Sequence, residues 1–533
     1  MMRLRECING LHVLFAFFAA SSSVGCTTTG AGAPAPGNPS AIASRDGQAI
    51  LRIIGTNDFH GGLEARPNAT GVMMGGAVAL AGAISRARSE CTPPRCYAVL
   101  VDAGDEFQGQ AASTIARGKP VSEIFNALGY DVAAMGNHDL DWGADTLRLR
   151  MAEERYPVLS ANYRRLDGRS ADWIKPTAII RRGPFVVGVI GIMTLEANAA
   201  IMTKNLVGFH FVDPVPIVDS LAVDLRRRGA NIVILAAHSG GRCDATGTAD
   251  CHGEMLVNAG RFSQKIDAIV SGHSHELVNT SVNGIPITGA RTAGQAIGVI
   301  DLALGGRVVA HDVRFAFPDS LPRDTTIARM VSAAIAAVGP RLNAPITTLA
   351  EDLRNVGRDY PLGMLLVDGM RAALPGADFA ATNATGFRSS LQAGVVTYGN
   401  LFDVQPFGNR LMAVTASGAS MRRYFEMLSV SRASSVFISG AVVTVDTTRP
   451  VGARVSAVTL PNGREMDDRA QYTIVITDFL VTGGLGLAFP DSSAVTKDLS
   501  ILDLEASIAY LRSLPSPVRA PRERRWLVVP PRP

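Results

Sequence analysis

Apolar runs and helix-like segments alternate along the first half of the chain, and polar residues follow directly after five of the runs. The runs read "ILRIIG", "YAVLV", "YDVAAM", "NIVILAA" and "IDAIVS". Runs of this kind are typical of parallel strands that are buried on both faces. Ligands collect at the carboxyl ends of such strands, so we expect the following polar side chains to meet in space. They are Asp58 and His60, Asp102 and Asp105, Asn137 and His138, His238, and His273 and His275.

Length and charge limit the classes of protein that the chain can belong to. With 533 residues, 47% of them hydrophobic, it is too long for one compact core, and we expect two domains plus a leader. Its 51 basic and 47 acidic residues are scattered, with no sustained basic block. Neither a nucleic-acid polymer nor a membrane surface is therefore indicated as a partner.

The N-terminus is typical of an export signal. Residues 1–26 place arginines before a short apolar segment and small residues, as secretory signals do. The small residue before Cys26 resembles a bacterial lipoprotein cleavage site, and ordinary secretion with cleavage nearby is the alternative. Residues 27–48, rich in Gly, Pro, Ala and Thr, are predicted to form a flexible tether. We expect a periplasmic or cell-surface protein, attached to the membrane only through a lipid on Cys26.

Two pairs of cysteines lie close together beyond the leader, Cys91 with Cys96 and Cys243 with Cys251. Export to an oxidising compartment makes both pairs candidates for disulfides. A zinc site is the alternative, but neither pair has the tight C-x-x-C spacing of zinc sites. The sequence favours disulfides.

The polar residues after the strands suit a metal centre. Asp, His and Asn without cysteine are ligands for divalent ions such as Zn, Mn, Fe or Co. A single histidine near a strand is usually a hydrogen-bonded core residue, but five of the nine histidines here follow strand-like runs. The remaining four have no such context and are interpreted as ordinary residues: His12, His210, His252 and His311.

These motifs, in the order D-x-H, G-D, G-N-H-D, a lone strand-end H and G-H-S-H, resemble those of the calcineurin-like metallophosphoesterases. The G-N-H-[DE]-x-D form with a C-terminal partner domain is similar to the 5′-nucleotidase family, which includes UDP-sugar hydrolases and cyclic-nucleotide phosphodiesterases. The resemblance implies an α/β fold with a four-layer α/β/β/α catalytic domain over residues 49–318 and a linker helix over 319–343. A C-terminal α+β substrate-binding domain would follow over residues 344–525.

The resemblance also implies roles for the polar cluster. Two divalent metal ions would activate a hydroxide for attack on phosphorus, with Asp105 bridging them. His138 would stabilise the transition state or donate a proton, and Asp141 would orient its ring. Asp139 is expected to point away as a turn residue, and Asp102, inside a strand, is not expected to be a ligand. The remaining ligands would be Asp58, His60 and His275 for one ion and Asn137, His238 and His273 for the other.

Motifs in the second half resemble the nucleotide-recognition turns of the same family. Phe407 and Phe479 lie in Gly-rich turns and would stack on a base, with core packing as the alternative for each ring. Asn383 and Arg388 match an N-x-x-G-x-R turn, whose arginine would hold phosphate oxygens. The segment "RNVGRDYPLGM" leaves Arg354 and Arg358 as alternatives for a further substrate contact.

One position departs from the family pattern. Where adenosine-cleaving members have an aspartate that accepts the ribose hydroxyls, this chain has Leu485 in "GGLG". The leading hypothesis is a two-metal hydrolase of the phosphate esters of extracellular nucleotides. The alternatives are a 2′,3′-cyclic-nucleotide phosphodiesterase, a UDP-sugar hydrolase, or a catalytically silent surface-binding protein.

Overall fold

The computed structural model of the protein describes residues 48–68, 71–356, 360–430 and 436–529. The predicted signal segment, the tether up to residue 47 and Cys26 lie outside the described residues, as do Arg358 and His12.

The first half of the described chain contains two six-stranded mixed sheets. In the first, with strand order β16-β15-β1-β4-β5-β6, the last four strands are parallel: β1 (Ile50–Thr56), β4 (Cys96–Asp102), β5 (Val132–Ala134) and β6 (Val158–Leu159). The antiparallel strands are β15 (Ala296–Ala303) and β16 (Val308–Phe315).

The second sheet has the strand order β13-β14-β12-β11-β9-β8. Its parallel strands are β9 (Phe185–Met193), β11 (Ile232–His238), β12 (Ala268–Ser271) and β14 (Ile285–Ala290). The outer strands β8 (Thr177–Arg182) and β13 (Leu277–Val282) pair antiparallel with their neighbours.

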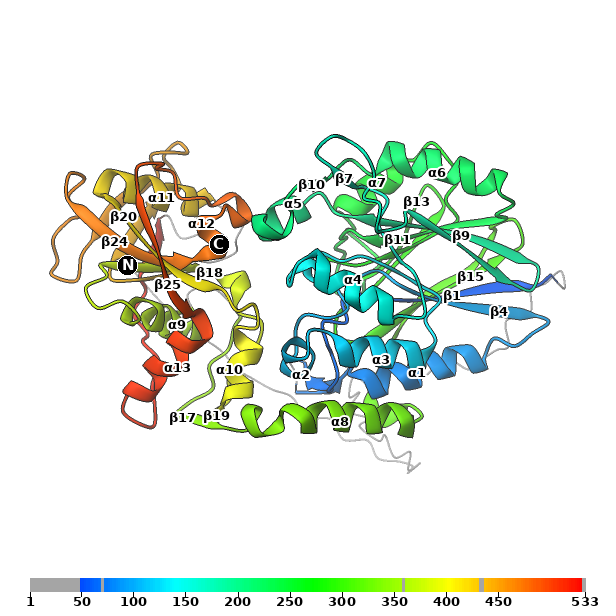
Figure 1. Cartoon of the computed structure of the whole chain (residues 1–533), viewed down its shortest axis with the longest axis horizontal. Coiled ribbons are helices and arrows are strands. Elements are labelled where there is room, and N and C mark those ends of the chain that lie inside the picture. The colour runs from blue at the N-terminus through cyan, green and yellow to red at the C-terminus, as the bar shows by residue number, and fades with distance from the viewer. Residues whose placement is uncertain (1–47, 69–70, 357–359, 431–435, 530–533) are drawn as a thin grey trace, which may run out of the picture. The chain divides into compact units, whose positions relative to one another are not determined.

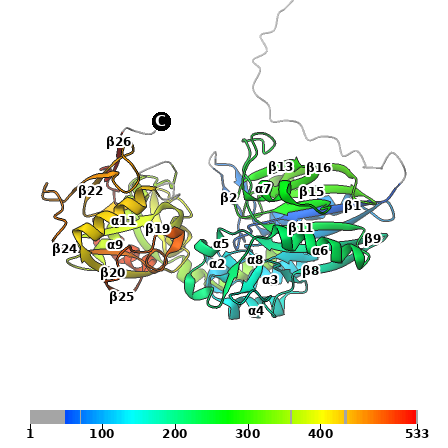
Figure 2. The ribbon, with the colours of Figure 1, turned by 90° about the horizontal axis from the view of Figure 1, so that it is seen from above.

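Helices cover the outer faces of both sheets (Figure 1). One core lies between the sheets, where Ile53 and Val101 of the first meet Val189 and Ile234 of the second. On the outside, α1 (Ala77–Ser89) and α3 (Lys119–Leu128) pack on the first sheet. The second sheet is covered by α6 (Val215–Arg227) and α7 (Glu254–Arg261), and α6 lies beside β9 and β11 in both views (Figures 1 and 2). The predicted four-layer α/β/β/α arrangement is confirmed.

Shorter elements connect the strands of this half. They are β2 (Arg66–Pro67), β3 (Met73–Met74), α2 (Ala111–Ile115), η1 (His138–Leu140), α4 (Ala144–Glu153), β7 (Tyr163–Arg165), α5 (Ala197–Ala200), η2 (Thr203–Asn205), β10 (Phe209–Phe211) and η3 (Pro318–Ser320).

The long helix α8 (Thr325–Leu342) falls within the range predicted for the linker. The side chain of Asp324 caps its first turn by accepting hydrogen bonds from the backbone N–H groups of Thr326 and Ile327. Along its length α8 packs against α1, α2 and α3, and also against α10 (Tyr398–Val404).

The C-terminal half is built on a five-stranded sheet with the order β21-β18-β24-β20-β25. Its strands are β18 (Phe379–Asn383), β20 (Arg410–Ser417), β21 (Val436–Ser439), β24 (Gln471–Thr477) and β25 (Val495–Leu502). Successive residues of β18 point to opposite faces, so Ala380 packs with α9 (Pro361–Ala372) and α13 (Asp503–Ser513). Phe379 faces the core that contains α11 (Gly418–Val430).

Two small sheets and several short helices complete this half. They are β17 (Pro345–Leu349) with β19 (Gly394–Thr397), the three strands β22 (Val442–Asp446), β23 (Val455–Thr459) and β26 (Trp526–Val529), and η4 (Ala384–Gly386), α12 (Asp478–Val481) and η5 (Gly484–Gly486).

Both predicted cysteine pairs are disulfides in the structure. Cys91–Cys96 joins the segment after α1 to the start of β4, and Cys243–Cys251 closes a loop between β11 and α7. The disulfide prediction is confirmed over the zinc alternative. Among the residues that the structure describes, no helix has the length and apolar character needed to cross a membrane.

Candidate active site

The five predicted strand ends converge where the two sheets meet. Asp58 and His60 follow β1, Asp105 follows β4, and His238 is the last residue of β11. The loops after β5 and β12 carry the other members: Asn137, His138, His273 and His275.

One group of ligand atoms is formed by Asp58, His60 and His275, whose donor atoms all lie within 4.8 Å of one another. Nε2 of His60 is 3.0 Å from Nε2 of His275, and the latter is 3.3 Å from Oδ1 of Asp58. The other ring nitrogen of His60 lies 2.7 Å from the backbone oxygen of Gln108. That contact fixes the ring with Nε2 toward the group.

A second group lies beside the first, and Asp105 adjoins both. Oδ2 of Asp105 is 3.2 Å from Nε2 of His238 and 3.5 Å from Nε2 of His60. Oδ1 of Asn137 lies 3.0 Å from both Nε2 of His238 and Nδ1 of His273. Nδ1 of His238 faces the backbone oxygen of Ala103 at 2.8 Å.

The donor set fits divalent cations. His60 and His238 each direct Nδ1 to a backbone carbonyl, which places a ring proton there and turns Nε2 toward the cluster. Both Nε2 atoms face the Asp105 carboxylate, an arrangement that is favourable with a positive charge, either a proton or a metal ion, at Nε2. Burial lowers the pKa of His60 to about 3, so its imidazole is neutral, as metal ligation requires. Burial alone would lower the pKa of His238, but the charge of Asp105 raises it to about 10, so a metal ion would bind there in exchange for the Nε2 proton.

The backbone of the cluster is strained. Five of its residues have left-handed φ angles, which non-glycine residues seldom adopt: Asp58 (50°), His60 (49°), Asp105 (61°), His273 (74°) and His275 (57°). Strain of this kind is kept where the surrounding structure holds residues in a functional geometry.

His138 and Asp141 form a pair at the edge of the cluster. Nδ1 of His138 lies 2.9 Å from Oδ2 of Asp141, and the backbone N–H of His138 donates to Oδ1 of Asp105 at 2.8 Å. The His138 ring is 5.3 Å from that of His60 and is 18% exposed in its side chain. An imidazole held in this way can exchange a proton with a group beside the candidate metal ligands.

Asp139 lies outside both ligand groups, but it does more than form a turn. Asp139 is buried, and its carboxylate accepts hydrogen bonds from the backbone N–H groups of Gly136 (2.8 Å) and Glu106 (3.0 Å). It therefore joins the loop after β5 to the loop that carries Asp105. The only sequence feature that could have indicated this role is the position of Asp139 within the G-N-H-D motif. Asp102 instead accepts hydrogen bonds from Thr56 and Gly104, outside both ligand groups.

A cavity of about 740 Å³ opens over this cluster and brings together residues from both halves of the chain. It is lined by all four predicted substrate residues: Asn383, Arg388, Phe407 and Phe479. The Phe407 ring stacks on His138 with centroids 5.5 Å apart, and the Arg388 guanidinium lies 5.7 Å from the Phe407 ring centre. Leu485 also lines the cavity, with a left-handed φ of 57°.

Other lining residues were not predicted. Asn409 and the buried Asp503 line the same cavity, and Nδ2 of Asn409 donates to Oδ2 of Asp503 at 3.1 Å. Glu196 lies 3.3 Å from Nε2 of His273. Asp503 begins α13 far along the chain, and no motif marks it. Arg354 is exposed and is not among the residues lining this cavity.

The comparisons with known proteins match a different family model to each half of the chain. Residues 51–277 match the family model for calcineurin-like phosphoesterases, and residues 342–491 match the model for the 5′-nucleotidase C-terminal domain. The chain belongs to the 5′-nucleotidase family of metallophosphoesterases.

Individual relatives support the same assignment. The 5′-nucleotidase precursor of Thermus thermophilus is 26% identical with a TM-score of 0.79, over 91% of this chain and all (100%) of that one. Endonuclease YhcR of Bacillus subtilis is 28% identical over 89% of the chain, and cell wall protein Lmo0130 of Listeria monocytogenes is 27% identical over 84%. The chain spans only 40% and 65% of the length of these two relatives.

Proposed function

We propose that this family member hydrolyses the phosphate esters of extracellular nucleotides, as a 5′-nucleotidase. One observation carries the proposal: a single cavity is lined by Asp105, by the His138–Asp141 pair and by Phe407, Phe479 and Arg388. Groups suited to phosphate chemistry and groups suited to a nucleotide therefore face the same space.

The ligand atoms support two metal sites that share Asp105. Asp58, His60 and His275 would hold one ion, and Asn137, His238 and His273 the other. We infer Zn, Mn, Co or Fe, because imidazole, carboxylate and amide ligands suit ions of this class. When bound, such ions polarise phosphate oxygens and lower the pKa of a coordinated water.

His138 would act on the phosphoryl group from the side of the cavity. Its Nδ1 faces Asp141, so the carboxylate fixes the ring orientation and favours the protonated imidazole. The Nε2 proton can then stabilise charge on the phosphoryl oxygens or pass to the departing oxygen.

The C-terminal half would supply recognition of the nucleotide. Phe407 and Phe479 are both half-buried rings in the cavity, and stacking on a base contributes about 1–3 kcal/mol per ring. The exposed Arg388 guanidinium can form two hydrogen bonds to phosphate oxygens, with Asn383 beside it in the lining.

We further propose that the protein is exported and anchored by a lipid on Cys26, in the periplasm or at the cell surface. The signal-like residues 1–26 and the two disulfides support export. One relative is a cell wall protein.

A hydrolysis panel tests the proposal. Metal-stripped protein is reloaded with Mn, Zn or Co and assayed on nucleoside 5′-monophosphates, 2′,3′-cyclic nucleotides, UDP-sugars and a simple aryl phosphate. We expect the highest kcat/KM on a nucleoside monophosphate. Turnover of a cyclic nucleotide or UDP-sugar with none of AMP would move the assignment to that activity.

A further inference from the structure

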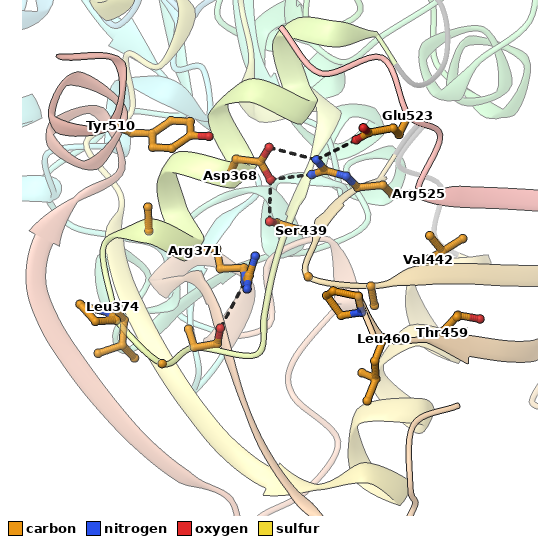
Figure 3. Close-up of a pocket in the computed structure, with 17 residues that line it drawn as sticks. Asp368, Arg371, Leu374, Ser439, Val442, Thr459, Leu460, Tyr510, Glu523 and Arg525 are labelled. Carbon is orange, nitrogen blue, oxygen red and sulfur yellow. Dashed lines mark hydrogen bonds and ion pairs between the residues drawn. The ribbon is translucent and has the colours of Figure 1, made fainter. Parts of the chain in front are cut away.

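A second cavity, of about 770 Å³, lies within the C-terminal half and shares no lining residue with the active-site cavity. Its walls come from α9 and the turn after it, the segment 439–442, the turn 459–461, α13 and the residues before β26 (Figure 3). Small-molecule sites commonly enclose about 300–1,000 Å³, so this cavity is large enough for a ligand.

Two of its charged groups neutralise each other. The Arg525 guanidinium forms two hydrogen bonds with Asp368, at 2.5 and 3.1 Å (Figure 3). Ser439 donates a third hydrogen bond to the same carboxylate at 2.6 Å, and Glu523 lies 3.6 Å from Arg525 at the exposed rim. The carboxylates that line this cavity are thus already engaged with a cation.

Arg371, the other arginine that lines this cavity, is not paired with a carboxylate of the described residues. Its Nε donates to the backbone oxygen of Ala377 at 3.2 Å, and within the described ranges its two terminal nitrogens have no protein partner (Figure 3). Gly440 leaves room for this guanidinium, because a Cβ there would lie 3.1 Å from Nε of Arg371. Arg371 therefore presents a two-nitrogen donor edge to the cavity, with no counter-ion in the part of the chain that the structure describes.

The remaining polar lining also offers a donor. Tyr510 of α13 has a hydroxyl with no hydrogen-bond partner among the described residues, and burial raises its pKa, which keeps the phenol protonated. The rest of the wall is largely apolar, with Leu374, Val442, Leu460 and Pro461. Donor groups together with this apolar surface match a ligand with an anionic end and an apolar body.

We propose that this cavity binds a small organic anion, a phosphate or carboxylate with an apolar body. The terminal nitrogens of Arg371 hold the anionic group in a bidentate contact, and the Tyr510 hydroxyl donates to it. The Leu460 turn covers the apolar part. The site is separate from the metal cluster, so it is a binding site and not a second catalytic centre.

Fluorine NMR tests the proposal on the metal-loaded full-length protein, with 4-fluorobenzoate and 4-fluorophenylphosphonate as probes. The two probes distinguish a carboxylate site from a phosphate site. We expect at least one of them to give a bound signal that Arg388→Gln, a change in the catalytic cavity, leaves unchanged. The phosphonate is expected to give a second bound signal, from the catalytic cavity, that Arg388→Gln weakens.

Two variants assign the signal that Arg388→Gln leaves unchanged. Arg371→Gln should weaken it about tenfold to a hundredfold, the usual effect of losing charge-assisted hydrogen bonds. Leu460→Trp should block the cavity without touching the charge. Arg512→Gln removes an exposed arginine of α13 outside the cavity and serves as the matched control. All three variants should keep wild-type phosphoester hydrolysis.

Two results would overturn the proposal. One is the absence, for both probes at millimolar concentration, of a bound signal that Arg388→Gln leaves unchanged. The other is a signal that persists unchanged in both Arg371→Gln and Leu460→Trp. Since hydrolysis does not enter either criterion, failure of the proposed nucleotidase activity would leave this test unaffected.

Discussion

Nδ1 of His138 lies 2.9 Å from Oδ2 of Asp141, one turn further along the same 3₁₀ segment. Burial by itself would lower the pKa of His138, but the charges of Asp141 and then Asp105 raise it above its ordinary value. The pair is therefore built to keep a proton on an imidazole that faces the cavity.

Replacing either member should slow turnover and leave the metals in place. We expect His138→Asn to lower kcat about 10²- to 10⁴-fold, the usual contribution of a general acid or base. Asp141→Asn should cost about 10- to 100-fold, because it disturbs only the orientation of the ring. Elemental analysis beside kinetics checks both. Metal loss in His138→Asn would make His138 a ligand and our assignment wrong.

Asp105→Asn should lose metal as well as activity, unlike the His138 and Asp141 variants. Asp105 is 3.2 Å from His238 and 3.5 Å from His60, so its neutral variant removes the anion common to both ligand groups. We expect lower metal content and no measurable hydrolysis. Asp102→Asn, at the end of the preceding strand, is the matched control. Asp102 accepts hydrogen bonds from Thr56 and Gly104 and belongs to neither ligand group. Equal metal content in the two variants would argue against a bridging role for Asp105.

The buried Asp503 should make the stability of the protein fall as pH rises. Burial raises the pKa of Asp503 to about 7, whereas in the unfolded chain it is about 3.9. Between these values the folded state holds a proton that the unfolded state has lost. Each pH unit in that window therefore lowers the free energy of unfolding by about 1.4 kcal/mol.

Asp503→Asn removes that titration and keeps an acceptor for the side chain of Asn409. Thermal unfolding of both proteins between pH 5 and pH 8 should show the variant gaining stability relative to wild type as pH rises. Parallel curves would mean that Asp503 is ionised throughout this range.

The sequence predicted those parts of the site that follow from strand ends. Asp58, Asp105 and His238 are brought together because parallel strands of two packed sheets end at the same edge, and an apolar run marks each strand. The disulfides were predictable for a similar reason, since each pair is close in the sequence.

Contacts set by packing were not predictable. Asp139 resembles a turn residue in the sequence, but the fold buries it against backbone N–H groups of two loops. The stacking of Phe407 on His138 joins residues that are far apart in the chain and depends on how side chains fill the cavity. Among the described residues, the two terminal nitrogens of Arg371 lack a protein partner because Arg525 forms the ion pair with Asp368, and the sequence does not show which arginine pairs.

Leu485 offers the sharpest test of how the sugar is recognised. It lines the cavity with φ 57° and ψ 19°, a left-handed conformation that aspartate and asparagine adopt more readily than leucine. Substitution by either residue should therefore not strain the turn. Leucine cannot accept hydrogen bonds from ribose, and base stacking on Phe407 and Phe479 does not depend on the 2′-hydroxyl. We expect the wild-type protein to hydrolyse AMP and dAMP with similar kcat/KM.

Leu485→Asp should then create a preference for the ribo form, because each charge-assisted hydrogen bond contributes about 1.5–3 kcal/mol. The ratio of kcat/KM for AMP over dAMP should rise about tenfold or more in this variant. Leu485→Asn, which accepts hydrogen bonds without charge, is the matched control and should give a smaller rise. A strong ribo preference in the wild-type protein would mean that another residue binds the ribose hydroxyls. Asn409 and Glu196 would then be the next residues to replace, because both line the same cavity.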